Sequence, residues 1–335
     1  MIAAQIGPLG LGDLLDGAFR IYRAHFVRML LTAAIFFVPL GILSTLLLGA
    51  VVGGYTDLLG VAVNEPVYGD SIATTVASSL FFALALFVVG ILNFICTMLG
   101  FLSLTVQSLS VLEGGAVTVL PSIRLGLGHL WRFLAMALIV VVLFLVLVTA
   151  TYMAVLIVFF GFALLVGLLL APAGDNPIVL IGVMGLTVLF SGAALGVIVL
   201  PLLALVARWL AAPVVLVAER LGPLAALGRS WHLTQHQTWR GILLVILLSI
   251  LNFVVLGLPV ALLQWLLLVA LTPEVLELVS GLVAGISLVF NMLWQPFLAI
   301  ALVLLYFDLR VRRESYDLEL QIGTIEAELR PSTLP

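Results

Sequence analysis

The chain has 335 residues, of which 64% are hydrophobic and only 9% are charged, and its formal net charge is −3. Soluble domains carry about 25% charged residues, and even large ones bury only about three quarters of their surface. A soluble fold could not hide this much apolar side chain, so the composition predicts an integral membrane protein. The acidic balance and the lack of basic runs argue against nucleic-acid binding.

Six apolar stretches are each long enough to cross a bilayer, which takes about 20 residues. They predict an all-α, polytopic membrane domain over 1–308, with spans at about 29–53, 74–111, 133–171, 178–207, 241–272 and 280–307. Hydropathy alone leaves open whether a stretch as long as 133–171 is one helix or a tight hairpin. No turn signal interrupts it, and a hairpin would move Arg220, Arg229 and Arg240 to the outer side. We therefore expect one long helix.

Charge predicts the orientation of these spans. The connections 54–73, 172–177 and 273–279 contain no arginine, whereas all 13 arginines and all four histidines fall on the other side. Arginine near short loops marks the cytoplasmic side. We expect a multi-pass protein of the bacterial plasma membrane with both termini in the cytoplasm. The outer connections carry Asp57, Glu65, Asp70, Asp175, Glu274 and Glu277.

An amphipathic segment precedes each odd-numbered span, at about 11–26, 113–131 and 219–239. Such segments are typical of helices that lie in the membrane interface. The pattern predicts three repeats of an interfacial helix plus a transmembrane hairpin. A cytoplasmic tail, 309–335, follows the last span, and it is either a surface helix behind a basic anchor or a docking helix for a partner.

Two groups of residues are candidate contact sites. The first group is basic and faces the expected inner leaflet, where it would contact anionic lipid or a protein partner: Arg310, Arg312, Arg313, Arg229 and Arg240. The second group is an intramembrane set of amides: Asn93, Asn252, Asn291 and Gln295. These amides either join helices or line a ligand cavity. One structural role is at Pro296, whose ring leaves the Met292 carbonyl without its usual donor, so that a neighbouring amide could replace it.

Other motifs favour structural roles over chemistry. His232 and His236 share a helix face, but the glutamate of the zinc-protease motif is missing and no third ligand is evident. Asp13 in Gly-Leu-Gly-Asp is expected to cap an interfacial helix. Arg208 ends the fourth span, where it would snorkel or pair with an acid: Glu113, Glu219 or Asp308. No charged residue lies at mid-membrane, which argues against an ion-coupled transporter. We expect no enzyme activity, no metal and no cofactor.

Three segments carry a resemblance to a known family. They are GPLGLGDLLDGAFRIYRAHF (7–26), ARWLAAPVVLVAERLGPLAALGRSWHL (207–233) and PFLAIALVLLYFDLRVRRESYDLEL (296–320). Their order and spacing resemble bacterial glycerophosphoryl diester phosphodiesterase membrane-domain proteins. The resemblance concerns the membrane part only, because no long polar segment is present to form the catalytic domain. It implies a membrane fold and location, and no established activity or ligand.

Two functional hypotheses follow. The first is a non-enzymatic scaffold or accessory subunit that acts through helix packing and inner-leaflet contacts. The second is a permease-like protein that handles a lipid or another amphipathic molecule between its hairpins. A neutral polar cavity that reaches one leaflet would favour the permease, whereas a solid apolar core would favour the subunit.

Overall fold

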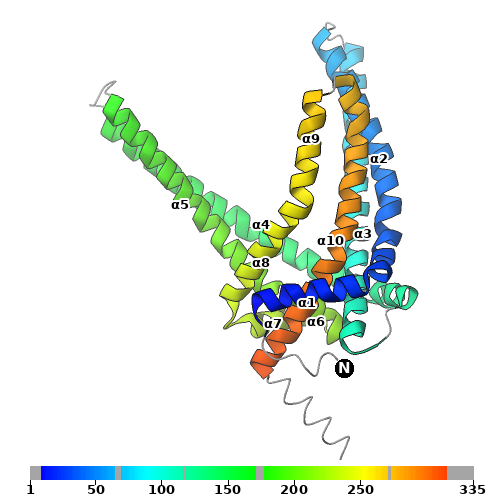
Figure 1. Cartoon of the computed structure of the whole chain (residues 1–335). Helices are drawn as coiled ribbons and strands as arrows, with labels where there is room; N and C mark the ends of the chain where they lie inside the picture. The colour runs from blue at the N-terminus through cyan, green and yellow to red at the C-terminus, as the bar shows by residue number, and fades with distance from the viewer. Residues whose placement is uncertain (1–8, 65–68, 116–117, 171–176, 271–272, 315–335) are drawn as a thin grey trace, which may run out of the picture. The chain divides into compact units, whose positions relative to one another are not determined.

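The computed structural model describes residues 9–64, 69–115, 118–170, 177–270 and 273–314. Within these ranges every regular element is a helix (Figure 1). Glu65, Asp175 and the tail beyond residue 314 lie outside them. The helices are α1 (Leu11–Ala24), α2 (Phe26–Asn64), α3 (Gly69–Leu112), α4 (Val119–Leu170), α5 (Pro177–Trp209), α6 (Ala212–Ala218), α7 (Pro223–Thr234), α8 (Thr238–Asn252), the π-helix η2 (Phe253–Gly257), α9 (Leu258–Ala270) and α10 (Pro273–Glu314).

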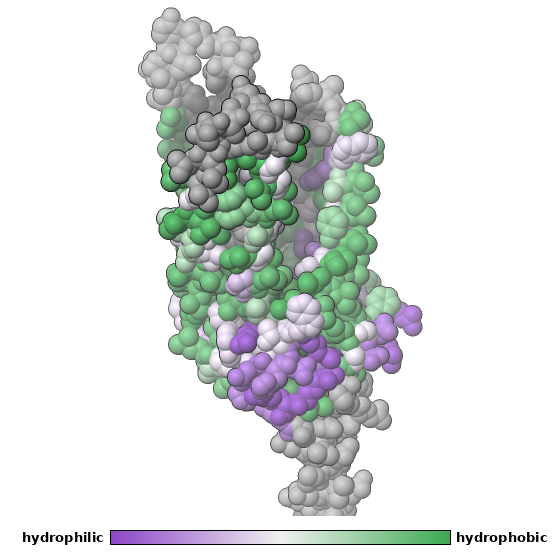
Figure 2. All heavy atoms as spheres, turned by 90° about the vertical axis from the view of Figure 1, so that its left-hand side faces the viewer, coloured by the Kyte–Doolittle hydropathy of each residue, from purple (hydrophilic) through white to green (hydrophobic). Residues whose placement is uncertain are grey.

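The fold is that of a multi-pass α-helical membrane protein, as the composition predicted. Among the described residues, six helical stretches are long and apolar enough to cross a membrane: Phe26–Leu46, Ser79–Leu112, Val119–Phe162, Val199–Ala218, Thr238–Leu267 and Gly285–Glu314. The fourth continues from α5 into α6, whereas the expected span was 178–207; α5 itself covers that range. Figure 2 shows hydrophobic residues along the sides of helices and hydrophilic residues gathered near helix ends.

The expectation of one long helix at 133–171 is confirmed up to Leu170. α4 runs without a break for 52 residues, and no hairpin divides it. At 1.5 Å per residue its length is about 78 Å, well beyond the roughly 30 Å hydrocarbon core. Part of α4 must therefore tilt within the bilayer or extend past it.

The three amphipathic segments form three different structures. The first is α1, a separate helix that lies across α10 (Figure 1) and also contacts α2. The second, 113–131, was wrongly expected to be a separate helix, because its residues from Val119 onward are the start of α4. Amphipathic periodicity cannot locate a helix break, and nothing after Pro121 interrupts the helix. The third contains α7, so the threefold repeat stays a prediction.

Two sharp turns lie in the connections that lead to α4 and α7. α3 ends in a Schellman motif, in which Gly114 has φ 82° and the Gly115 N–H reaches the Ser110 carbonyl at 2.7 Å. Between α6 and α7, Arg220 adopts a left-handed conformation with φ 53°. A non-glycine residue is strained there by about 1–2 kcal/mol, so the surrounding packing must hold this turn.

The chain forms two compact units, which we describe separately. The first unit comprises Met1–Trp131, Pro213–Leu221 and Ile246–Pro335, and the second comprises Arg132–Ala212 and Gly222–Val245. In the first unit, α2, α3 and α10 pack together and α1 packs on α10. All residues of 100–109 in α3 and of 299–309 in α10 are buried. These stretches form a closely packed core at the end of the unit where α1 lies.

In the second unit, α7 covers the carboxyl end of α5. The hydroxyls of Ser230 and Thr234 donate to the Arg208 carbonyl at 2.8 and 3.2 Å. These bonds supply donors at a helix end that otherwise lacks them. The Arg208 guanidinium lies over the Trp231 ring, 4.1 Å from its centroid. Arg208 thus makes a cation–π contact within this unit, and its snorkelling or pairing with Glu113, Glu219 or Asp308 stays a prediction.

Candidate functional site

Asp308 and Arg312 hold the backbone that leads into α1. Asp308 is fully buried near the end of α10, and its Oδ1 accepts from the Arg312 Nε at 3.0 Å and from the Leu9 N–H at 2.8 Å. Arg312 Nη2 in turn donates to the Leu9 carbonyl at 2.8 Å. Both backbone groups of Leu9 are thus bound by an i,i+4 ion pair on α10. This arrangement fixes the start of α1 against the end of the last span.

A second contact joins α10 to the turn after α6. The Tyr306 hydroxyl donates to Glu219 Oε1 at 3.0 Å. Glu219 directly precedes the strained residue Arg220. The bond therefore anchors that turn on the closely packed part of α10.

A third contact joins α1 to the middle of α10. The Tyr22 hydroxyl donates to the Leu293 carbonyl at 2.9 Å, three residues before Pro296. The carbonyl that Pro296 leaves without its usual helix donor is that of Met292, so the Tyr22 hydroxyl bonds the carbonyl next to it in the sequence. Burial raises the pKa of Tyr22 to about 12, because the phenolate is disfavoured away from water. The phenol therefore keeps the proton that it donates.

Together these bonds bring the three resemblance segments to one place. Leu9 and α1 belong to the first segment, Glu219 to the second, and Tyr306, Asp308 and Arg312 to the third. We call this part of the first unit the basic end, defined by α1, residues 100–112 of α3, the first turns of α4, residues 213–221 and residues 297–314 of α10. Its exposed arginines include Arg20, Arg23 and Arg124.

The predicted arginine cluster on α10 is partly engaged within the chain. Arg312 bonds Asp308 and Leu9, and Arg310 Nε pairs with Glu314 at 3.1 Å. Arg313 is half-buried, as are Arg229 and Arg240 in the second unit. A role in lipid or partner contact stays a prediction for all five residues. For Arg312 it would compete with the bond that holds Leu9.

The predicted repair at Pro296 by an amide is not seen. The Asn291 amide donates one turn earlier, to the Ser287 carbonyl at 3.0 Å, and the Tyr22 hydroxyl bonds Leu293, the residue after Met292. Gln295 is buried, and its Oε1 has no hydrogen-bond partner among the described residues. Sequence reasoning missed Tyr22 because the bond joins residues 271 positions apart.

The other two predicted amides, Asn93 and Asn252, lie in α3 and at the end of α8. The Asn93 Oδ1 accepts from the Thr97 hydroxyl at 3.2 Å within α3, and Asn252 is half-buried immediately before η2. Sequence reasoning did not select Gln107, which is fully buried in α3 with both amide atoms unbonded among the described residues. None of the predicted amides lines either hollow described below, so their role as a ligand patch stays a prediction.

An aromatic pocket of about 320 Å³ lies between α1, η2 and α10. Trp294 and Phe297 are almost fully buried at its base, and Phe19, Phe26 and Val255 are exposed at its edge. Tyr22, Leu251 and Leu293 complete the lining. The π-helix η2 borders this pocket through Val255 and ends two residues before Pro259 in α9. π-Helical segments are frequent at functional sites.

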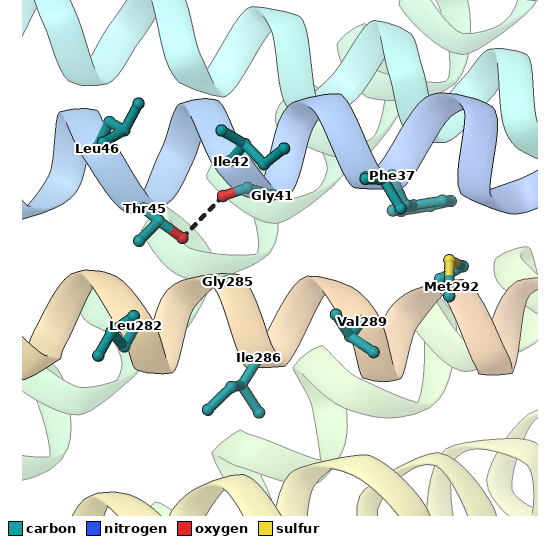
Figure 3. Close-up of a pocket in the computed structure, with 11 residues that line it drawn as sticks. Phe37, Gly41, Ile42, Thr45, Leu46, Leu282, Gly285, Ile286, Val289 and Met292 are labelled. Carbon is teal, nitrogen blue, oxygen red and sulfur yellow. Dashed lines mark hydrogen bonds between the residues drawn. The ribbon is translucent and has the colours of Figure 1, made fainter.

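A second hollow is an apolar groove of about 390 Å³ between α2 and α10 (Figure 3). Gly285 faces the Thr45 and Gly41 turn of α2, and a Cβ at Gly285 would collide with the Thr45 hydroxyl. That hydroxyl donates to the Gly41 carbonyl at 2.8 Å. Gly285 therefore makes one close helix contact, whereas Gly192 and Gly196 have open space beside them.

The described residues include few candidates for metal binding or catalysis. No group of three or more His, Cys, Asp or Glu side chains gathers among the residues that the structure describes. His232 and His236 are both exposed in the second unit. The N-cap residue of α1 is Gly10, and Asp13 is the third helical residue, whose carboxylate accepts from the Gly10 N–H at 3.0 Å. Asp13 therefore caps the helix from within its first turn and not from the N-cap position. The Cys96 thiol is half-buried in α3.

Comparison with known proteins adds no assignment: no protein-family model, curated protein or solved structure matches the chain.

Proposed function

We propose that this chain is a non-enzymatic membrane scaffold or accessory subunit of the bacterial plasma membrane. Both termini would be cytoplasmic, and the basic end would lie at the inner leaflet. The observation that carries the proposal is the convergence of Leu9, Glu219 and Asp308 on one closely packed helix end. Catalysis and transport need access to a reacting or moving ligand, whereas this end is tied together by bonds between distant segments.

The charge distribution supports the orientation. In the first unit, Arg28 lies at the start of α2, and the other arginines up to residue 313 lie at the basic end: Arg20, Arg23, Arg124, Arg220, Arg310, Arg312 and Arg313. Arginine is retained on the cytoplasmic side during insertion, and it attracts anionic lipid by about 1 kcal/mol per residue near the surface. The resemblance to the phosphodiesterase membrane-domain family agrees with a membrane role.

The second candidate, a permease-like protein for an amphipathic molecule, is favoured by the aromatic pocket. That pocket is apolar and open at Phe19 and Val255. A permease would also need a path to the other leaflet. The amides Asn93 and Asn291 are the polar groups that such a path would use, and neither lines the pocket.

Purification in mild detergent tests the proposal, with co-purifying proteins and lipids identified by mass spectrometry. We expect an anionic lipid or a stoichiometric protein partner, which the double change Arg310→Gln and Arg313→Gln weakens. Arg312 is left intact because it binds Asp308. The matched outer-side variant neutralises Asp57, Glu65 and Asp70, and should retain the bound species. Loss in the outer-side variant with retention in the arginine variant would overturn the proposal.

Transport assays separate the two candidates. The purified protein is reconstituted into vesicles that carry a fluorescent phospholipid in one leaflet. A scaffold should leave the rate of lipid transfer between leaflets at the protein-free level. Protein-dependent transfer that is lost when the pocket is filled would instead establish the permease.

A further inference from the structure

We propose that the aromatic pocket beneath α1 binds one acyl chain of an anionic phospholipid, whose headgroup is held by Arg23. The inference deepens the proposed function, since it relies on α1 lying at the inner leaflet. It assigns the lipid contact to α1, whereas the sequence had suggested Arg310, Arg312 and Arg313 near the end of α10, together with Arg229 and Arg240.

The pocket has the shape of a lateral slot for a chain. Trp294 is 9% exposed and Phe19 is 58% exposed, so the pocket has a buried base and an open side. Its volume of about 320 Å³ is at the lower end of ligand pockets, which range over about 300–1,000 Å³. It can therefore accept part of one chain, not a whole lipid. The residues that line it are apolar apart from the hydroxyl of Tyr22, which is bonded to Leu293.

The depth of the pocket suits a lipid that enters from the headgroup layer. α1 lies across α10 (Figure 1) and also contacts α2, as an interfacial helix does. Phe19 and Tyr22 come from this helix, while Trp294 and Phe297 come from the membrane-spanning part of α10. The pocket thus begins at the interfacial helix and extends into the apolar layer, where the first part of an acyl chain lies.

Arg23 supplies the charge complementarity. It lies one turn after Phe19 on α1, so both side chains project from the same side of the helix. Arg23 is exposed, and the structure describes no ion pair for it within the ranges given above. Arg20 is also exposed but has Asp16 one turn before it. Arg23 is therefore better placed to bind a phosphate at the open side of the pocket.

The lipid headgroup, more than the acyl chain, should determine which phospholipid the pocket prefers. An acyl chain that enters the pocket leaves an environment as apolar as the one it enters, so chain burial contributes little preference between lipids. Arginine near an anionic headgroup favours it by a factor of about five. We expect phosphatidylglycerol to be preferred over phosphatidylcholine with the same chains, and Arg23→Gln to reduce that preference about fivefold.

Photo-crosslinking of the full chain in nanodiscs tests both parts of the inference. The probe is phosphatidylglycerol or phosphatidylcholine with a diazirine in one acyl chain, and labelled peptides are identified by mass spectrometry. The wild type should be labelled in the peptides that contain Leu251 and Trp294. Val255→Trp fills the pocket and should abolish this labelling. Its matched control is Val254→Trp, because Val254 is 51% and Val255 is 45% exposed on the same π-helix and only Val255 lines the pocket.

The charge control is Arg124→Gln, which removes an exposed arginine of the basic end from α4 and should leave the preference for phosphatidylglycerol unchanged. Equal labelling of the Val254→Trp and Val255→Trp variants would overturn the pocket assignment. So would cross-linking of the pocket to a co-purified protein in place of the lipid. If the pocket remains unlabelled while an anionic lipid depends on Arg310 and Arg313, this inference fails and the proposed function stands. If neither lipid nor partner is retained, both fail.

Discussion

The hydroxyl of Tyr22 lies 2.9 Å from the carbonyl oxygen of Leu293 and donates a hydrogen bond to it. One residue belongs to the helix that lies across the spans, and the other to the turn before the proline of the last span. The bond therefore fixes the position of α1 against the middle of α10. It also forms one side of the aromatic pocket, so stability and the proposed binding site depend on the same contact.

Tyr22→Phe should destabilise the protein by about 0.5–1.5 kcal/mol, the net contribution of one intramolecular hydrogen bond, because the Leu293 carbonyl would lose its side-chain donor. Thermal or denaturant unfolding in detergent measures the effect. The control is Tyr152→Phe, since Tyr152 is 54% exposed on α4. A loss of the same size in both variants would show that the Leu293 bond contributes nothing specific.

The same residue predicts a pH dependence. Its folded-state pKa is raised to about 12 from an ordinary value of 10.0, so the unfolded chain releases this proton first as the pH rises. The stability associated with Tyr22 is complete below pH 10 and is lost between pH 10 and 12. The difference in stability between wild type and Tyr22→Phe should therefore shrink over that window. A difference that stays constant would contradict the assignment of the buried phenol.

Asp308→Asn should release the segment that leads into α1. The change removes the charge that binds Arg312 and weakens the bond to the Leu9 N–H, and breaking a buried pair costs about 3–5 kcal/mol. We expect a loss toward the lower part of that range, because the Arg312 side chain is 26% exposed. Hydrogen exchange at residues 9–14 should increase. The control is Glu314→Gln, whose pair with Arg310 is more exposed and should contribute at most about 1 kcal/mol. Unchanged exchange in Asp308→Asn would contradict the anchoring role.

Gln107→Met should stabilise the protein. Both amide atoms of Gln107 are buried without a hydrogen-bond partner among the described residues, and an unsatisfied buried polar group costs about 1–3 kcal/mol. Methionine has a similar shape and removes that cost. Unfolding measurements should show a gain of about 1 kcal/mol. A clear loss would show that the amide is bonded in the membrane.

Gly285→Ala should weaken the contact between α2 and α10. The added Cβ would displace the Thr45 hydroxyl from its bond to Gly41, and overpacking of a tight contact costs about 1–3 kcal/mol. Gly182→Ala is the matched change, because Gly182 has open space beside it on α5. It should be neutral or slightly stabilising. Equal effects of the two changes would argue against close packing at Gly285.

Cysteine labelling tests the orientation of the spans. After Cys96 is replaced by alanine, cysteines at Glu65, Asp175 and Glu274 should react with an impermeant thiol reagent in intact cells. Cysteines at Arg124, Arg229 and Glu319 should react only after permeabilisation, because arginine-bearing connections stay in the cytoplasm. External labelling at Arg229 would contradict the six-span topology.

Local sequence was sufficient for the class of fold. A chain with 64% hydrophobic residues and six long apolar stretches cannot fold as a soluble protein. In lipid its backbone groups must be hydrogen-bonded internally, which favours helices. The continuity of α4 also followed from the lack of a turn signal between 133 and 170. The capping role of Asp13 followed in the same way, because it depends on residues within one helical turn.

Only the tertiary structure decided how the distant segments meet. The partners of Asp308, Glu219 and Tyr22 are 299, 87 and 271 positions away, and hydropathy carries no information about such pairs. For the same reason, sequence reasoning assigned amides to Pro296 and arginines to the inner surface. It predicted neither the role of Tyr22 nor the aromatic pocket. Interfacial aromatics were a usable signal, but which of them would enclose a pocket depends on how α1 crosses α10.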